Sequence, residues 1–310
     1  MIDRLKYTLS LLEQQTVPKE KVIVILGPTA SGKTKLAVQL AQHIDAEIIS
    51  ADSRQIYRRM DIGTGKDLSE YQDIPYHLID IHEPGERYNL GNFIADFRQA
   101  QQSILEKGKH TILCGGTGLY IQSVIQQNPY ALIPSIEGFK ESLLAYPETE
   151  LLTRLQEYTL PVNFQIDLST KKRIIRAIEI LAFLENHPDH IVQQQAVDSI
   201  VIGLNPPLEI RREHISQRLK QRLNEGLLEE VCVLLTEGIT HEQLQYYGLE
   251  YKYASLHLLG QLDYSAFTTK LETEIHRYAK RQMTYFRKME KDGIIIHWYK
   301  QYNAIKTKKG

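Results

Sequence analysis

The sequence predicts an α/β protein in which a parallel sheet is flanked by helices on both faces and interrupted by a small helical insertion domain. First, short apolar runs rich in β-branched residues, such as 22–26, alternate with segments whose apolar residues recur at helical spacing, such as 36–44. Second, these runs lack polar alternation, which is typical of strands covered on both faces. Third, residues 128–190 contain repeated prolines and short apolar clusters but no evident strand.

The elements follow in order along the chain. Strands are expected at 22–26, 47–50, 77–81 and 111–114 and, beyond the insertion, at 199–204 and 293–298. Apolar stripes predict helices over about 36–44, 93–104, 215–223 and 271–286. The predicted domains are therefore a core formed by 1–127 and 191–310, and a helical insertion over 128–190.

Composition excludes several classes of protein. The 310 residues carry a net charge of −1, so a nucleic-acid surface must be a local patch rather than a property of the whole chain. The cysteines Cys114 and Cys232 form no metal-ligand pattern and fit a reducing compartment. The N-terminus does not resemble a signal peptide, and no apolar run approaches the roughly 18–20 residues needed to cross a bilayer. We expect a cytoplasmic monomer with no membrane partner.

The loop between the first strand and its helix has the composition of a phosphate-binding loop. It consists of Gly27, Pro28, Thr29, Ala30, Ser31, Gly32, Lys33 and Thr34. A glycine-rich turn at a helix N-terminus directs backbone N–H groups and the positive end of the helix dipole toward an anion. Lys33 can then reach phosphate oxygens, and the Thr34 hydroxyl can ligate Mg²⁺, the expected cofactor. The core is thus predicted to be P-loop NTPase-like and to bind a di- or triphosphate.

Other polar residues follow strands of the same predicted sheet. Asp52 and Ser53 come directly after the second strand, and Thr117 follows the strand at 111–114. Ligands of such sheets bind outside the carboxyl ends of the strands. We therefore expect these residues and the phosphate loop to converge on one crevice.

The phosphate loop alone leaves its chemistry open. A GTPase is disfavoured because no Asn/Thr-Lys-x-Asp element for guanine is found. A generic ATPase would use a strand that ends in a metal-holding Asp, whereas the strand at 111–114 ends in Gly-Gly-Thr. An ATP-dependent small-molecule or nucleoside kinase remains an alternative, since Arg58 and Arg59, or Arg173 and Arg176, could cover a transferred phosphoryl group. A non-enzymatic RNA-binding protein is disfavoured by the intact loop.

Four further motifs narrow the choice. They read DSRQIY at 52–57, DIGT at 61–64, GGTGLY at 115–120 and RYAKRQMTYFR at 277–287. Together with the phosphate loop they resemble the tRNA dimethylallyltransferase (isopentenyl-tRNA transferase) family over about residues 21–287. The resemblance implies an enzyme that transfers a dimethylallyl group from dimethylallyl diphosphate to N6 of the adenosine 3′ to the anticodon in tRNA, releasing diphosphate.

The resemblance also assigns catalytic residues. An adenine amino group is a poor nucleophile and needs a base to accept its proton, and Asp52 matches the catalytic aspartate of the family. Thr117 would hold the adenine or the phosphate from the opposite strand end, and Arg277 would place a further cation on the diphosphate. Each residue also has a structural alternative. Asp52 could hold Mg²⁺ or cap a helix, Thr117 could stabilise the Gly-Gly-Thr-Gly turn, and Arg277 could lie on a solvated helix face.

The tRNA contacts are expected from several segments. Asp52, Ser53, Arg54, Gln55 and Thr117 could contact the extruded base or its phosphates. By resemblance, Lys172, Arg173, Ile174, Ile175 and Arg176 form a tRNA-contacting stretch, and Lys140 adds another cation. Tyr246 and Tyr247 could offer stacking surfaces, although we expect both to be buried. The chain departs from the family pattern at Tyr285, where Trp is usual, and at Gly248–Lys252, which replaces Gly-Tyr-Lys.

Overall fold

The computed structural model describes residues 2–126, 129–136, 138–161, 164, 167–188 and 196–299. The chain divides into two compact units, one formed by Met1–Gln126 with Ala196–Gly310 and the other by Gln127–Gln195. No helix in the described ranges combines the length and the apolar character that crossing a membrane requires.

The larger unit is built on a parallel sheet with the strand order β3-β2-β4-β1-β5-β6. Its strands are β1 (Val22–Leu26), β2 (Ala46–Ala51), β3 (Tyr76–His77), β4 (His110–Gly115), β5 (Ser199–Gly203) and β6 (Ile296–Trp298). All five residues of β1 are buried, as expected of a central strand covered on both faces. The predicted α/β fold with a parallel sheet flanked by helices is confirmed.

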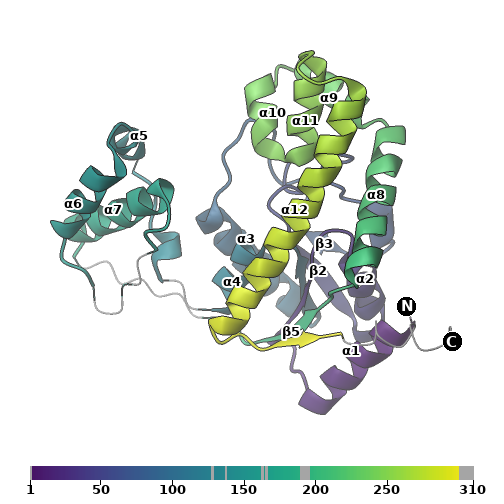
Figure 1. The fold of residues 1–310 in the computed structure, drawn as a ribbon. Coiled ribbons are helices and arrows are strands. Elements are labelled where there is room, and N and C mark those ends of the chain that lie inside the picture. The colour runs from purple at the N-terminus through teal and green to yellow at the C-terminus, as the bar shows by residue number, and fades with distance from the viewer. Residues whose placement is uncertain are drawn as a thin grey trace. The chain divides into compact units, whose positions relative to one another are not determined.

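Helices connect and cover these strands (Figure 1). They are α1 (Ile2–Gln15), α2 (Lys33–Ile44), α3 (Leu90–Glu106), α4 (Gly118–Ile125), α8 (Leu208–Asn224), α9 (Leu227–Thr236), α10 (His241–Tyr247), α11 (Leu249–Leu258) and α12 (Tyr264–Lys291), with a 3₁₀ turn η1 at Leu68–Tyr71. The long helix α12 packs against α4, α8 and α11, so it joins the sheet to the C-terminal helices.

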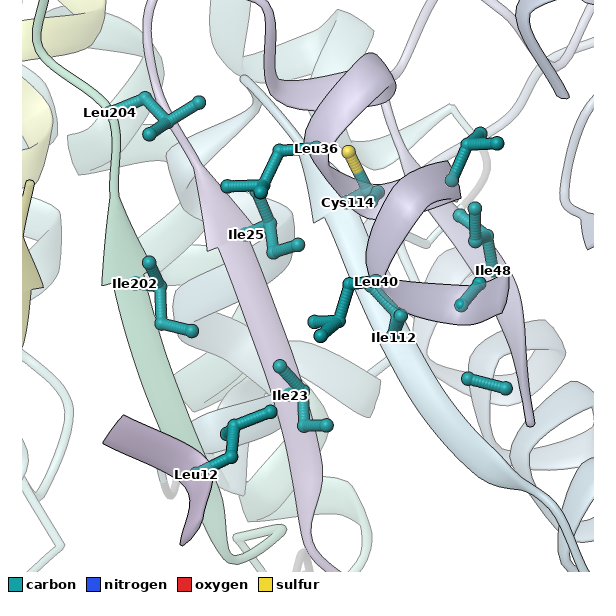
Figure 2. Packing of buried hydrophobic residues seen from close by; sticks show 14 of the residues in the cluster. Leu12, Ile23, Ile25, Leu36, Leu40, Ile48, Ile112, Cys114, Ile202 and Leu204 are labelled. Carbon is teal, nitrogen blue, oxygen red and sulfur yellow. The ribbon is translucent and has the colours of Figure 1, made fainter. Parts of the chain in front are cut away.

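The apolar core of this unit lies between the sheet and α2. Ile23 and Ile25 of β1 are fully buried and point toward Leu36 and Leu40 of α2 (Figure 2). Side chains from α1 extend this core, with Leu12 buried beside the sheet. The packing fixes the N-terminus of α2, and with it the loop that precedes α2.

The predicted strand at 77–81 is wrong beyond its first residue. The strand β3 ends at His77 because Leu78 and Asp80 adopt left-handed backbone angles, with φ of 61° and 57°. This turn directs the Asp80 carboxylate to the buried ammonium of Lys66, which also donates to the Tyr57 carbonyl at 2.7 Å. A sequence pattern with alternating apolar residues cannot distinguish such a turn from a longer strand.

The smaller unit contains the 3₁₀ turn η2 (Pro129–Leu132) and the helices α5 (Phe139–Leu144), α6 (Glu148–Gln156) and α7 (Lys171–Asn186). It has its own apolar core, in which Leu151 and Leu155 of α6 pack with Ile174 and Ile178 of α7.

Candidate active site

The phosphate loop begins with a glycine that packs closely against Leu204, the residue after β5. A Cβ on Gly27 would lie 2.7 Å from the carbonyl oxygen of Leu204, so only glycine allows this approach. Ala30 and Gly32 have positive φ values of 58° and 80°, which reverse the chain immediately before α2. The loop therefore leaves β1 and presents the N-terminus of α2 at the carboxyl end of the sheet.

Lys33 begins α2, and several titratable groups act on its pKa. Burial lowers the pKa of Lys33, and the nearby Asp52 carboxylate opposes this effect. Burial raises the pKa of the Cys114 thiol, near the end of β4, to about 12, so this thiol is neutral at physiological pH. In the structure Lys33 Nζ is 3.5 Å from the Pro28 carbonyl oxygen, where it closes the loop on itself.

A cavity of about 530 Å³ opens at this end of the sheet. The predicted site residues that line it are Thr29, Lys33, Thr34, Asp52, Ser53, Arg54, Gln55 and Thr117. The structure thus brings residues from the ends of β1, β2 and β4 together around one space. Ala30, Ser31 and Gly32 line a second cavity of about 620 Å³ on the other side of the same loop, and Lys33 and Thr34 line both.

Backbone contacts fix the Asp52 segment. Asp52 Oδ1 accepts a hydrogen bond from the Arg54 amide at 3.0 Å. The Ser53 amide donates to Thr117 Oγ1 at 3.2 Å, and the Thr117 amide donates to the Ala51 carbonyl at 3.1 Å. Thr117 therefore joins the ends of β2 and β4, which holds Asp52 in place.

Gln282 of α12 connects the phosphate loop to the loop after β4. Its Oε1 accepts a hydrogen bond from the Thr29 amide at 2.8 Å, and its Nε2 donates to the Gly116 carbonyl at 3.0 Å. A Cβ on Gly116 would lie 2.3 Å from Gln282 Nε2, so this glycine is required by the contact. The sequence placed Gln282 inside a family motif but gave it no role.

The DIGT segment is anchored by Glu230 of α9, which sequence reasoning missed. Its carboxylate accepts hydrogen bonds from the amides of Asp61, Ile62 and Gly63 at 2.8, 2.7 and 3.0 Å, and from the Tyr251 hydroxyl at 2.6 Å. Residues of this segment line both cavities, so Glu230 sets the position of the wall between them.

Two arginines of α8 were also missed. Arg218 lines both cavities and donates to the Gly65 carbonyl at 3.2 Å. Arg222 lines the first cavity and pairs with Glu250 at 2.8 Å, and burial lowers its pKa. The apolar stripe of α8 predicts only which face of the helix is buried. It does not show which distant residues the two arginines contact, so the sequence could not assign them to the cavity.

Arg277 lies apart from these residues. It is on the exposed side of α12, where it pairs with Glu274 at 2.5 Å, and it is absent from the described lining of either cavity. Its predicted contact with a diphosphate stays a prediction.

The predicted tRNA stretch begins α7. Lys172 and Arg173 are exposed, and Arg173 pairs with Asp167 at 2.6 Å. Arg176 instead donates to the carbonyls of Tyr130 and Pro134 at 3.4 and 3.5 Å, so it stabilises its own unit. Lys140 is exposed on α5.

The two isoleucines of this stretch need a correction. Ile174 and Ile175 are each 1% exposed and belong to the core of the smaller unit. Their helical spacing places them on the apolar face of α7, so their side chains are not available to RNA in this structure.

Two family models together match residues 20–289 of this chain. The sequence model of the IPP transferase family matches residues 55–289, and that of isopentenyl transferase matches 20–74. A tRNA dimethylallyltransferase 2 from Porphyromonas gingivalis is 50% identical over 281 residues, covering 89% of this chain and 93% of that protein. One from Trichlorobacter lovleyi is 45% identical, covering 89% and 91%.

Solved structures give the same result. The tRNA isopentenylpyrophosphate transferase from Bacillus halodurans superposes with a TM-score of 0.66 at 33% identity, covering 91% of this chain and 90% of that one. A eukaryotic dimethylallyltransferase acting on tRNA, at 22% identity and a TM-score of 0.72, covering 93% and 76%, shares the fold. The chain therefore belongs to the IPP transferase family of tRNA dimethylallyltransferases.

Proposed function

We propose that this protein transfers the dimethylallyl group of dimethylallyl diphosphate to N6 of the adenosine 3′ to the anticodon in tRNA and releases diphosphate. One observation carries the proposal: Lys33 and Thr34 of the phosphate loop and the Asp52 carboxylate line the same cavity. A diphosphate at the loop and an adenine at Asp52 would then face each other across that space. Family membership supplies the identity of both substrates.

The phosphate loop acts on the leaving group. As the allylic C–O bond breaks, negative charge grows on the diphosphate, and donors already directed at it stabilise the transition state more than the ground state. The Lys33 ammonium and the N–H groups at the start of α2 supply these donors. Arg218, which lines both cavities, adds positive charge to the same region.

Asp52 acts on the acceptor. As the bond between N6 and the allylic carbon forms, the nitrogen must release a proton, and the Asp52 carboxylate accepts it. The hydrogen bond from the Arg54 amide occupies one carboxylate oxygen and orients the other. Thr117 keeps this segment fixed relative to the end of β4.

The donor set fits Mg²⁺. No cluster of three His, Cys, Asp or Glu side chains that could hold a metal is found among the described residues. Mg²⁺ is commonly bound by one or two protein oxygens together with substrate phosphates and water, rather than by a full protein cage. The Thr34 hydroxyl at the start of α2 would be the protein ligand, and the bound ion would neutralise charge on the diphosphate.

The tRNA would present an unpaired base. The target atom is inaccessible inside a stacked loop, so the adenosine must be extruded, which costs little in a single-stranded anticodon loop. Ser53, Arg54 and Gln55 line the cavity beside Asp52, and Lys172 and Arg173 of the smaller unit would contact RNA phosphates.

A single incubation tests the function. The purified protein is mixed with Mg²⁺, ATP, unmodified tRNA and dimethylallyl diphosphate labelled in the prenyl group. We expect the label on the tRNA and no consumption of ATP. Consumption of ATP without transfer would instead support a kinase, and tRNA binding with neither reaction would support a non-enzymatic RNA-binding protein. A tRNA with guanosine at the target position is the matched control and should remain unlabelled.

A further inference from the structure

An exposed tyrosine lies on the wall of the active cavity. Tyr246, near the end of α10, is 57% exposed, whereas the adjacent Tyr247 is 3% exposed. The expectation that both tyrosines are buried is therefore wrong for Tyr246. A side chain that lines the cavity and is also more than half exposed lies where the cavity opens to solvent.

The Tyr246 ring is supported by its neighbours. Tyr247 meets it edge to face, with ring centroids 5.6 Å apart and an interplanar angle of 80°. Tyr247 is itself fixed, since it packs edge to face on the buried Tyr57 at 4.7 Å and its hydroxyl accepts a hydrogen bond from the Gly85 amide. The ring is thus an aromatic surface on a rigid support, with low cost in conformational entropy on binding.

A cation lies over the same ring. The guanidinium carbon of Arg54 is 5.2 Å from the centroid of Tyr246. In the described part of the chain, no carboxylate forms a salt bridge with Arg54. Aromatic rings that stack on bases, next to arginines that pair with phosphates, are the combination by which proteins hold single-stranded nucleic acid.

The surface is also tied to the catalytic aspartate. The Arg54 amide donates to Asp52 Oδ1 at 3.0 Å, and only Ser53 lies between these two residues in the chain. A nucleotide whose amino group reaches Asp52 would therefore have its neighbour in the RNA close to this ring. We infer that Tyr246 and Arg54 form a stacking platform that holds the nucleobase adjoining the target adenosine in its extruded arrangement. This inference rests on the proposed function.

The test is a double-mutant cycle in which variants of the protein are combined with variants of the RNA. Tyr246→Leu keeps an apolar side chain but removes the ring face, while Tyr246→Phe keeps the face. The RNAs are an anticodon stem-loop and versions that lack the base on the 5′ side of the target, on its 3′ side, or at the target itself. Tyr264→Leu is the matched control, because Tyr264 is 53% exposed and is absent from the described cavity lining. Dissociation constants are measured for each pair.

We expect Tyr246→Leu to weaken binding of the complete stem-loop by about 5- to 150-fold, the range that loss of one stacked base produces. Tyr246→Phe and Tyr264→Leu should bind as the native protein does, and the KM for dimethylallyl diphosphate should not change. One of the two RNAs lacking a neighbouring base should bind the native protein weakly and show no further loss with Tyr246→Leu.

Three results would overturn the inference. The first is that Tyr246→Leu binds the complete stem-loop as tightly as the native protein does. The second is that Tyr246→Leu weakens binding of both RNAs lacking a neighbouring base by the same factor as it weakens the complete stem-loop, and the third is that only the RNA lacking the target base escapes this further loss. These outcomes are separate from the proposed function, which is judged by label transfer with the native protein. Because Tyr246 is exposed, thermal melting of Tyr246→Leu should match that of the native chain, and this checks that the variant is folded.

Discussion

The backbone amide of Thr29 donates a 2.8 Å hydrogen bond to the side-chain oxygen of Gln282, although 253 residues separate the two along the chain. The nitrogen of the same side chain donates to the Gly116 carbonyl at 3.0 Å. One buried amide on α12 therefore sets the spacing between the phosphate loop and the loop that carries Thr117. In the proposed function the first loop binds the leaving group and the second lies beside the acceptor, so we expect this spacing to matter for catalysis.

Replacing Gln282 should lower kcat more than it changes substrate binding. Gln282→Leu removes the partner of the partly buried Thr29 amide and of the Gly116 carbonyl and frees the two loops to shift. We expect kcat to fall by roughly 10- to 100-fold, since misplacement by about 1 Å can cost about 100-fold. The measurement is single-turnover transfer at saturating substrates.

Two variants serve as controls for Gln282. Gln102→Leu changes an exposed glutamine of α3 and should transfer at the native rate. Gln282→Glu keeps an acceptor for the Thr29 amide but loses the donor to the Gly116 carbonyl. Its kcat should therefore lie between those of the native protein and Gln282→Leu. Native turnover by Gln282→Leu would show that the loops keep their spacing without it.

Asp52→Asn tests whether Asp52 is the group that accepts the proton from N6. Asparagine keeps the oxygen that accepts from the Arg54 amide, so the loop should hold its shape while the proton acceptor is lost. We expect the rate of the chemical step to fall by roughly 100- to 10,000-fold with little change in tRNA affinity. Asp45→Asn, at an exposed carboxylate, should have no effect. If Asp52→Asn turns over normally, another group accepts the proton.

The lowered pKa of Lys33 should make diphosphate binding depend on pH. A lysine is charged below its pKa, and burial lowers the pKa of Lys33, so its charge is lost at a lower pH than that of an exposed lysine. The affinity for inorganic diphosphate should therefore fall as pH rises through that lowered pKa. Calorimetric titrations from about pH 7 to 10 measure this, since exposed lysines titrate near 10.4.

Diphosphate itself also titrates, and arginine substitutions separate its contribution to the pH dependence of binding from that of Lys33. Lys33→Arg stays charged over this range and should remove the part of the pH dependence that belongs to the protein. Lys35→Arg, an exposed neighbour on α2, should leave the native profile unchanged. Identical profiles for Lys33→Arg and the native protein would contradict the assignment.

Glu230→Gln should loosen the DIGT segment. Glutamine offers one acceptor oxygen and turns an amide N–H₂ toward backbone donors, so the hydrogen bonds from 61–63 cannot all survive. We expect the free energy of unfolding to drop by about 1–3 kcal/mol and the KM for dimethylallyl diphosphate to rise. Urea denaturation and steady-state kinetics measure these changes.

The neighbours of Glu230 provide its controls. Glu229→Gln removes an exposed carboxylate one position earlier and should be neutral. Tyr251→Phe removes a single hydrogen bond to Glu230 and should cost only about 0.5–1.5 kcal/mol. A Glu230→Gln protein as stable as Glu229→Gln would mean that the segment is held by its other contacts.

Lys172→Ala combined with Arg173→Ala tests the proposed tRNA surface of the smaller unit. These side chains are exposed, whereas Arg176 supports carbonyls of its own unit and would confuse stability with binding. If both contact phosphates, the slope of log affinity against log salt should become shallower by about one to two. Lys6→Ala with Lys220→Ala removes the same charge from exposed positions elsewhere and should keep the native slope. An unchanged slope in the first variant would place this face away from RNA.

Much of the fold could be predicted because its signals are local. The strand at 22–26 matches β1, and those predicted at 47–50, 111–114 and 199–204 lie within one or two residues of β2, β4 and β5. The last predicted strand shortens to Ile296–Trp298, and the helix at Ile2–Gln15 was not predicted. A run of buried β-branched residues or a glycine-rich turn is written in neighbouring positions, so it can be recognised without knowing the rest of the chain.

The sequence by itself determined the phosphate loop, the position of Asp52 after a buried strand and, through its motifs, the family. Only the tertiary structure decided that Gln282 bridges Thr29 and Gly116, that Glu230 holds the DIGT segment, and that Tyr246 faces solvent. The physical reason is the range of the interactions. Strand and turn preferences act between adjacent residues, whereas a side chain's partner and exposure depend on which distant elements pack against it.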